Sequence, residues 1–327
     1  MIEADAVPPG LPNSGNVLRR FTRALRLVLV LVVAGFVLAT LVRLARGFDA
    51  REVTWHWPAL CLTALGLVAT NLMQAMAWVR LLSRMSHRVL PARPILAGFM
   101  AGQLARYVPS GKIALLVVRT AAVAGLGLPH RLVASSIGLE VLSWVTVGMS
   151  MGSACLALSS RLAFSSNLAV LSQSWLSFWS LALVAASVFS IAMLLVVDRR
   201  RFPKWALRLI NAEGEGPLLS LDVLGWQVAS WFGPVIQGLL LPIAVGAAFS
   251  KAWPLTGVFL LAPIAGFLAV VAPGGLGVRE AVLSFALAPE LGASRALAVA
   301  LLARVTFVVS EVIAWMLTKW ISRRRPT

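Results

Sequence analysis

The chain is short of charged residues, and this scarcity excludes a soluble globular fold. Charged residues occupy 13% of 327 positions and hydrophobic residues 59%, whereas a globular domain carries charge at about a quarter of its positions. Uncharged runs at residues 57–79, 162–197 and 223–250 exceed the roughly 18–20 residues that cross a bilayer core. We therefore predict an all-α, polytopic transmembrane helical bundle.

Cysteine and histidine are also scarce. The two cysteines, Cys61 and Cys155, lie in separate apolar runs, and only three histidines are present. We expect both cysteines to pack as small hydrophobic side chains, with no disulfide framework and no metal site. No phosphate-binding loop, nucleophile elbow or paired-histidine motif occurs. The sequence therefore predicts no catalytic residue, no cofactor and no enzymatic activity.

Acidic residues are few, at 12 against 29 basic ones, which gives a net charge of +17. The basic residues form short clusters between apolar runs, at residues 19–26, 80–93, 199–208 and 323–325. Such clusters are typical of cytoplasmic loops beside anionic lipid. We therefore expect cytoplasmic N- and C-termini, membrane lipids with anionic headgroups as partners, and no nucleic acid.

The apolar runs predict six full spans, at about 25–44, 58–82, 131–158, 168–197, 219–248 and 295–320. Residues 1–20 are predicted to form a disordered cytoplasmic tail, 21–322 a single transmembrane domain, and 323–327 a basic end. Residues 199–212 mix basic and aromatic residues, which suggests an interfacial helix. Arg43 and Arg46 follow the first run, where signal cleavage would require small neutral residues, so the first helix is expected to be retained.

Two further apolar regions are interrupted by proline and glycine. Residues 94–108 and 113–127 are each too short for a full span, and a break around Pro109 and Gly111 separates them. The run at 253–272 leads into a second break, which contains Pro273, Gly274, Gly275 and Gly277. Because proline and glycine break helices, we predict a re-entrant helical hairpin at each region.

The two interrupted regions resemble each other. PILAGF at residues 94–99 matches PIAGF at 263–267 with one gap, and PSG at 109–111 corresponds to PGG at 273–275. Each half, about 25–158 and about 168–320, would then contain two spans, a broken hairpin and one more span. An odd number of crossings inverts the second half, which predicts the inverted structural repeat of many secondary transporters.

Eight charged residues lie inside the apolar segments. A charge at the centre of a membrane helix costs about 2.5–3.5 kcal/mol on insertion scales, so such residues usually pair or line a polar cavity. The five basic residues are predicted to bind an anionic lipid headgroup, because arginine grips phosphate with paired hydrogen bonds. These are Arg106, Lys112, Arg119, Arg279 and Arg304, and the predicted gating or charge partners are Glu140, Glu280 and Glu311.

The roles of some charges stay open at this point. Free backbone N–H groups at each break would add anion-binding capacity, but Glu280 could simply complement its helix N-terminus and Arg279 could pair elsewhere. Glu140 and Arg304 hold equivalent places in the two halves, so we predict that they approach each other, as a structural or a gating pair. Glu311 follows Arg304 by seven residues and shares its helix face.

The motif PGGLGVRE at residues 273–280 resembles the transmembrane region of lysylphosphatidylglycerol synthase, the flippase-like part of the bacterial multiple peptide resistance factor. The resemblance covers roughly residues 20–320. The first motif, RYVPSGK at 106–112, is a looser match, with Ala114 where the family often has glycine. The resemblance implies lipid movement between leaflets of the bacterial cytoplasmic (inner) membrane without ATP hydrolysis. It also implies envelope-lipid biosynthesis enzymes as partners, and without an aminoacyl-transferase domain no lysyl-lipid synthesis is expected.

Together these patterns predict a flippase-like transporter of a phosphate-bearing lipid, either a phospholipid or a polyprenyl-phosphate-linked sugar. Two alternatives stay open. One is a membrane-embedded lipid-modifying enzyme or its non-catalytic subunit, and the other is an ion-coupled permease for a soluble anion. Lateral openings between helices would favour a lipid, and a sealed central cavity would favour the permease. The sequence does not indicate an oligomeric state.

Overall fold

The computed structural model describes residues 53–107, 111–162, 173–196, 219–269 and 273–323, together with residues 42, 46 and 51. For residues 111–112, 160–162, 173–180 and 194 it describes the backbone only. Every regular element within these ranges is a helix, which confirms the all-α prediction. Five helices there are long and apolar enough to cross a membrane, as expected of an integral membrane protein. The predicted tail 1–20 and interfacial helix 199–212 lie outside the described residues, as do the predicted first helix 25–44 apart from residue 42 and the predicted basic end 323–327 apart from residue 323.

The helix boundaries agree closely with most predicted spans. The described helices are α2 (Trp57–Met85), α3 (Ala92–Ala105), α4 (Gly111–Val123), α5 (His130–Leu162), α6 (Gln173–Val196), α8 (Leu221–Ser230), α9 (Phe232–Ala244), α10 (Phe249–Leu268), α11 (Val278–Leu291) and α12 (Ala293–Arg323), with short 3-10 turns η2 (Ala124–Leu126) and η5 (Pro273–Gly275). The five candidate spans are α2, α5, α8 with α9, α10 and α12. Helix α6 corresponds to the predicted span at 168–197.

The span predicted at about 219–248, with interruptions expected at Pro234 and Pro242, consists of two helices, α8 and α9, with a break at Trp231. Pro234 explains the position of the break. A proline ring clashes with the carbonyl four residues earlier, here that of Ser230, and removes the N–H that would bond to it. Pro242 lies inside α9 without ending it at that residue.

Contacts between helix ends show which ends lie together. The His56 backbone N–H donates to the Ala244 carbonyl at 3.0 Å, which places the start of α2 beside the end of α9. At the other end of α2, Arg84 forms an ion pair with Asp222 at 3.1 Å, so α8 starts there. Helices α2 and α8–α9 are therefore antiparallel neighbours.

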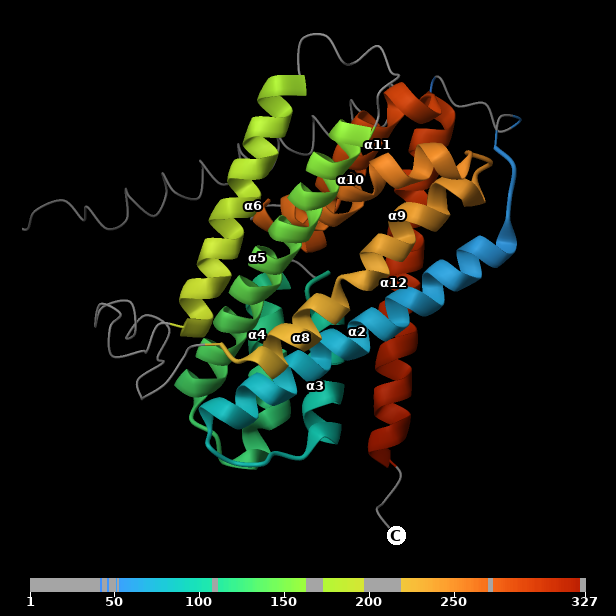
Figure 1. Ribbon diagram of the computed structural model, residues 1–327. Coiled ribbons are helices and arrows are strands. Elements are labelled where there is room, and N and C mark those ends of the chain that lie inside the picture. The colour runs from blue at the N-terminus through green and yellow to red at the C-terminus, as the bar shows by residue number, and fades with distance from the viewer. Residues whose placement is uncertain are drawn as a thin grey trace, which may run out of the picture.

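The helices on the two sides of each break pack against each other. Helix α3 packs against α4, and α10 packs against α11. Lys251, near the start of α10, donates to the Glu290 carbonyl near the end of α11 at 3.2 Å. At 1.5 Å per residue, α3, α4 and α11 are each only about 20 Å long, whereas α10 reaches about 30 Å. Figure 1 shows α3 and α4 toward one end of the molecule and α11 toward the opposite end.

Candidate functional site

The end of the α3 segment meets the second helix break inside the molecule. Tyr107 lies two residues after the end of α3, and its ring lies against Gly274 in η5. Gly274 has a φ of +57°, and a Cβ atom there would lie 2.7 Å from Tyr107 Cδ1. Glycine is required at this position both for the left-handed backbone conformation and for the close approach. The end of the α3 segment and the second break thus form one junction.

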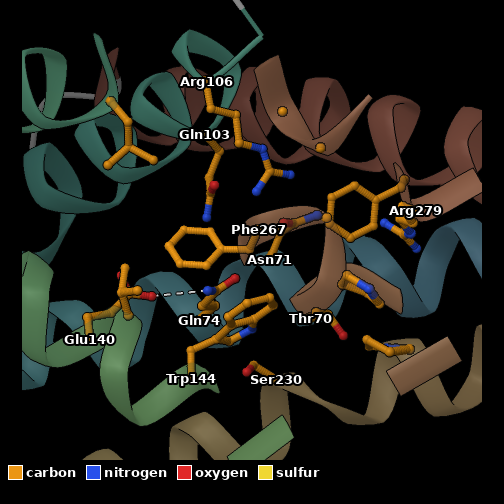
Figure 2. Close-up of a pocket in the computed structure, with 18 of the residues that line it drawn as sticks. Thr70, Asn71, Gln74, Gln103, Arg106, Glu140, Trp144, Ser230, Phe267 and Arg279 are labelled. Carbon is orange, nitrogen blue, oxygen red and sulfur yellow. Dashed lines mark hydrogen bonds between the residues drawn. The ribbon is translucent and has the colours of Figure 1, made fainter. Parts of the chain in front are cut away.

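A cavity of about 110 Å³ lies beside this junction, enough for several water molecules. Four arginines contribute to its lining, Arg106, Arg119, Arg279 and Arg304, together with Gly274 and Gly275 from the second break. Among the described residues, Glu140 is the one carboxylate in the lining. Figure 2 shows Arg106 and Arg279 on different sides of the space, with Glu140 at a third position. The wall is therefore strongly basic.

Three ion pairs hold most of these charges. Arg119 on α4 donates to Glu140 on α5 at 3.0 Å, and both side chains are almost fully buried. Arg106 after α3 pairs with Glu311 on α12. Arg304 on α12 lies 3.6 Å from Glu280 on α11. Each pair links two helices, so the charges also tie the bundle together.

Arg279 is the arginine without a carboxylate. Its side chain is buried, with 4% of the residue exposed. Its Nη2 donates to the Gln237 amide oxygen at 2.8 Å, and its guanidinium lies 4.5 Å from the Phe307 ring centre. Within the described part of the chain it forms no ion pair. No carboxylate of the described residues lies within ion-pair distance of its guanidinium, which favours an anionic ligand in the adjoining cavity.

The predicted ion pair between Glu140 and Arg304 is not formed. Both residues contribute to the cavity lining, but Glu140 pairs with Arg119 and Arg304 pairs with Glu280. The physical reason is local packing. Each of these residues lies on the helix that follows a broken segment, and the nearest opposite charge is on the short helix directly before it.

Glu280 does complement its helix N-terminus. Its carboxylate accepts a hydrogen bond of 2.6 Å from the Gly277 backbone N–H at the start of α11. One of the N–H groups predicted to be free for an anion therefore already has a carboxylate partner. The same carboxylate lies beside Arg304, so Glu280 has both roles. In the first break, Pro109 and the side chain of Lys112 lie outside the described residues, while Gly111 begins α4.

Several uncharged residues at the site were not predicted from the sequence. The Tyr107 hydroxyl donates to Glu311 at 2.7 Å, and its ring lies 4.9 Å from the Arg304 guanidinium. Gln74 on α2 donates to Glu140 at 3.0 Å, as the dashed line in Figure 2 marks. Thr70, Gln103 and Trp144 also line the cavity. The glutamines could have been identified from the sequence, because an amide side chain within an otherwise apolar helix is costly to bury unless it is hydrogen-bonded.

The arrangement suits the binding of an anion rather than metal chemistry. Guanidinium groups donate paired hydrogen bonds to phosphate oxygens, and carboxylates behind Arg106 and Arg304 fix their positions. No group of three or more histidine, cysteine, aspartate or glutamate side chains gathers within the described residues. No protein-family model and no curated protein matches the chain.

Proposed function

We propose that this protein is a flippase-like transporter that moves a phosphate-bearing lipid between the leaflets of a membrane. The observation that carries the proposal is the basic cavity at the junction of the α3 segment and the second break. Within an integral membrane protein, a buried Arg279 without a carboxylate is costly unless an anion compensates it. Lipid phosphates are abundant anions at both surfaces of a membrane, where a transporter that opens to either leaflet would meet them.

The cavity's position supports alternating access as the mechanism. The segments α3–α4 and α10–α11 reach the junction from opposite ends of the molecule (Figure 1). We infer two inverted halves, each with a re-entrant hairpin, in a bundle of six full spans. Opening one hairpin at a time would expose the cavity to one leaflet at a time.

The ion pairs would act as gates in such a cycle. Arg106–Glu311 and Arg304–Glu280 both involve α12, and each joins it to a different broken segment. A phosphate that enters can take over hydrogen bonds from Arg106 or Arg304 and so weaken one pair at a time. After the lipid leaves, the carboxylates would pair with the arginines again and hold them beside the cavity.

The motif at residues 273–280 supports the same family of transporters, the flippase-like transmembrane region described above. The resemblance supports a bacterial cytoplasmic membrane as the location, and the basic clusters support both termini on the cytoplasmic side. Envelope-lipid biosynthesis enzymes are the partners that this proposal implies.

The test is leaflet translocation in proteoliposomes. Wild type, Arg279→Met and Arg88→Met would be reconstituted with fluorescent phosphatidylglycerol, and the fraction reaching the outer leaflet measured by dithionite quenching. Methionine keeps the packing of the arginine stem but removes its charge. We expect Arg279→Met to slow translocation about tenfold or more, because a hydrogen bond to a charged group is lost. Arg88→Met is the matched control, since Arg88 is exposed and outside the cavity.

Equal rates for wild type and Arg279→Met would contradict the proposal. The same vesicles separate the alternative functions. Uptake of labelled inorganic phosphate without lipid movement would identify a permease, and a change in lipid mass would identify a lipid-modifying enzyme.

A further inference from the structure

The cavity lining contains uncharged polar groups as well as arginines. Gln103 on α3 and Thr70 on α2 line the cavity and are 4% and 7% exposed. Neither side chain forms a hydrogen bond within the described part of the chain. Figure 2 shows Gln103 extending from α3 toward the space above α2, whereas the Thr70 hydroxyl lies on the side of α9, next to Gly233. The lining therefore includes a Gln103 amide with no hydrogen-bond partner among the described residues.

Two other buried amides of the bundle have hydrogen-bond partners. Gln237 donates to the Ala303 carbonyl and to Thr306 and accepts from Arg279. Gln227 donates to the Glu140 carbonyl and to Ser143, although its amide oxygen has no hydrogen-bond partner within the described residues. A buried amide without a partner is destabilising, so the Gln103 amide is expected to bond to something that enters the cavity.

Two aromatic rings, those of Trp144 and Phe267, also line the cavity. Trp144 stacks on Trp231 with ring centres 4.7 Å apart, and Phe267 meets the Trp144 ring edge-on at 6.1 Å. The Trp231 indole N–H donates to the Trp144 carbonyl at 3.1 Å, which fixes the pair. Fixed rings offer a flat apolar surface that suits the C–H face of a sugar or polyol, while amides and hydroxyls bond to its edges.

A headgroup that carries an amine fits this cavity less well than a neutral, hydroxyl-bearing one. A cationic group needs a free carboxylate, and the carboxylate of the lining, Glu140, already bonds to Arg119 and Gln74. The four arginines of the lining would also repel a second positive charge. The charge distribution therefore favours a neutral, hydroxyl-bearing group beside the phosphate.

We propose that the headgroup bound in this cavity is a phosphodiester of a sugar or polyol, whose hydroxyls bond to Gln103 and Thr70 while Arg279 binds its phosphate. This inference rests on the proposed function, because it assumes that the cavity receives a phosphate-bearing lipid. It narrows the substrate class to phosphoglycolipids and polyol phospholipids. Gln103 and Thr70 determine specificity, and Arg279 provides affinity.

The test compares two lipids with equal charge and equal chains. Dioleoyl phosphatidylglycerol has two headgroup hydroxyls, and dioleoyl phosphatidylmethanol has none. Affinities for the purified full chain would be measured by native mass spectrometry titration. We expect wild type to prefer phosphatidylglycerol about tenfold, the effect of one or two hydrogen bonds. Gln103→Leu and Thr70→Val should each reduce this preference to about threefold or less, while phosphatidylmethanol still binds, which also shows that the variants are folded.

Thr146→Val is the matched control for Thr70→Val. Thr146 bonds to carbonyls of its own helix and does not line the cavity, so the preference should stay at the wild-type value. Equal wild-type affinity for the two lipids would overturn the inference. A preference for dioleoyl phosphatidylethanolamine over phosphatidylglycerol would overturn it in favour of an amine.

Two further arms separate this inference from the proposed function. If Arg279→Met binds both lipids as wild type does, the phosphate role in the proposed function fails, while a retained preference for glycerol still supports the hydroxyl site. If soluble glycerophosphoglycerol binds as tightly as the lipid, the lipid source fails and the hydroxyl site again stands. Binding of none of these probes would overturn both proposals.

Discussion

At the residue scale, buried ion pairs allow arginine and glutamate to exist inside an apolar bundle. The Arg119–Glu140 pair is the most deeply buried, with side chains 1% and 2% exposed. Neighbouring side chains stabilise both charges. The Arg119 guanidinium lies 3.8 Å from the Phe99 ring centre, and Glu140 accepts a second hydrogen bond from Gln74. Such a pair contributes little net stability when intact but is costly to break.

We predict that Arg119→Met destabilises the protein by about 3 kcal/mol, because Glu140 is then buried without its cation. The measurement is the free energy of unfolding in mixed micelles. The double variant Arg119→Met/Glu140→Met serves as the control and should recover at least half of the loss. A double variant as unstable as the sum of both single variants would show that the two side chains do not interact.

At the scale of helices, close approach between elements depends on particular small residues. On α5, a Cβ atom at Gly148 would lie 2.0 Å from Trp231 Cζ2, whereas one at Gly138 would meet nothing within 4 Å. Trp231 is fully buried at the α8–α9 break. It has little room to move, because its indole N–H is bonded to the Trp144 carbonyl. The contact between α5 and this break therefore requires glycine at one position and not at the other.

This contrast gives a matched pair of variants on one helix. Gly148→Ala should lower stability by about 2 kcal/mol through overpacking. Gly138→Ala should raise it by up to about 1 kcal/mol, because alanine is the better helix former. Thermal unfolding in detergent measures both. If the two variants shift the midpoint by the same amount, α5 does not pack against Trp231 as described.

At the scale of the whole molecule, the two halves place ion pairs at similar positions with exchanged signs. In the first half the short helix after the break carries the arginine and the following helix the glutamate, as in Arg119–Glu140. In the second half the short helix carries Glu280 and the following helix Arg304. This correspondence is what related halves would show, and the inverted repeat itself stays a prediction.

Side-specific labelling tests the predicted orientation. In a Cys61→Ala/Cys155→Ala background, Arg88→Cys and His130→Cys should react with a membrane-impermeant maleimide only from the cytoplasmic side. Lys251→Cys should react only from the opposite side, because the start of α10 follows the end of α9 and lies across the bundle from the basic clusters. All three positions are exposed. Labelling of Arg88→Cys and Lys251→Cys from the same side would contradict the arrangement.

Much of the fold was predictable from local sequence. An uncharged run long enough to cross a bilayer must satisfy its backbone as a helix, and the boundaries of α2, α5, α6 and α12 follow from that rule. Proline and glycine also mark the breaks, since their backbone restrictions are properties of the residue itself. An interruption of the span at 219–248 was predicted at Pro234, and the helix break lies three residues upstream, at Trp231, because a proline disrupts the turn that precedes it.

The charged residues show which properties of the site the sequence determines and which the tertiary structure decides. Their number, their sign and their unusual place within apolar helices are determined by the sequence, because the cost of burying a charge holds for any fold. Their pairing is decided by the tertiary structure. Arg106 reaches Glu311 across 205 positions of the chain, and only the crossing of α3 and α12 brings them together. Among the described residues, the same crossings leave Arg279 without an ion-paired carboxylate and Gln103 without a hydrogen-bond partner, because contacts between distant helices depend on geometry that no local pattern contains.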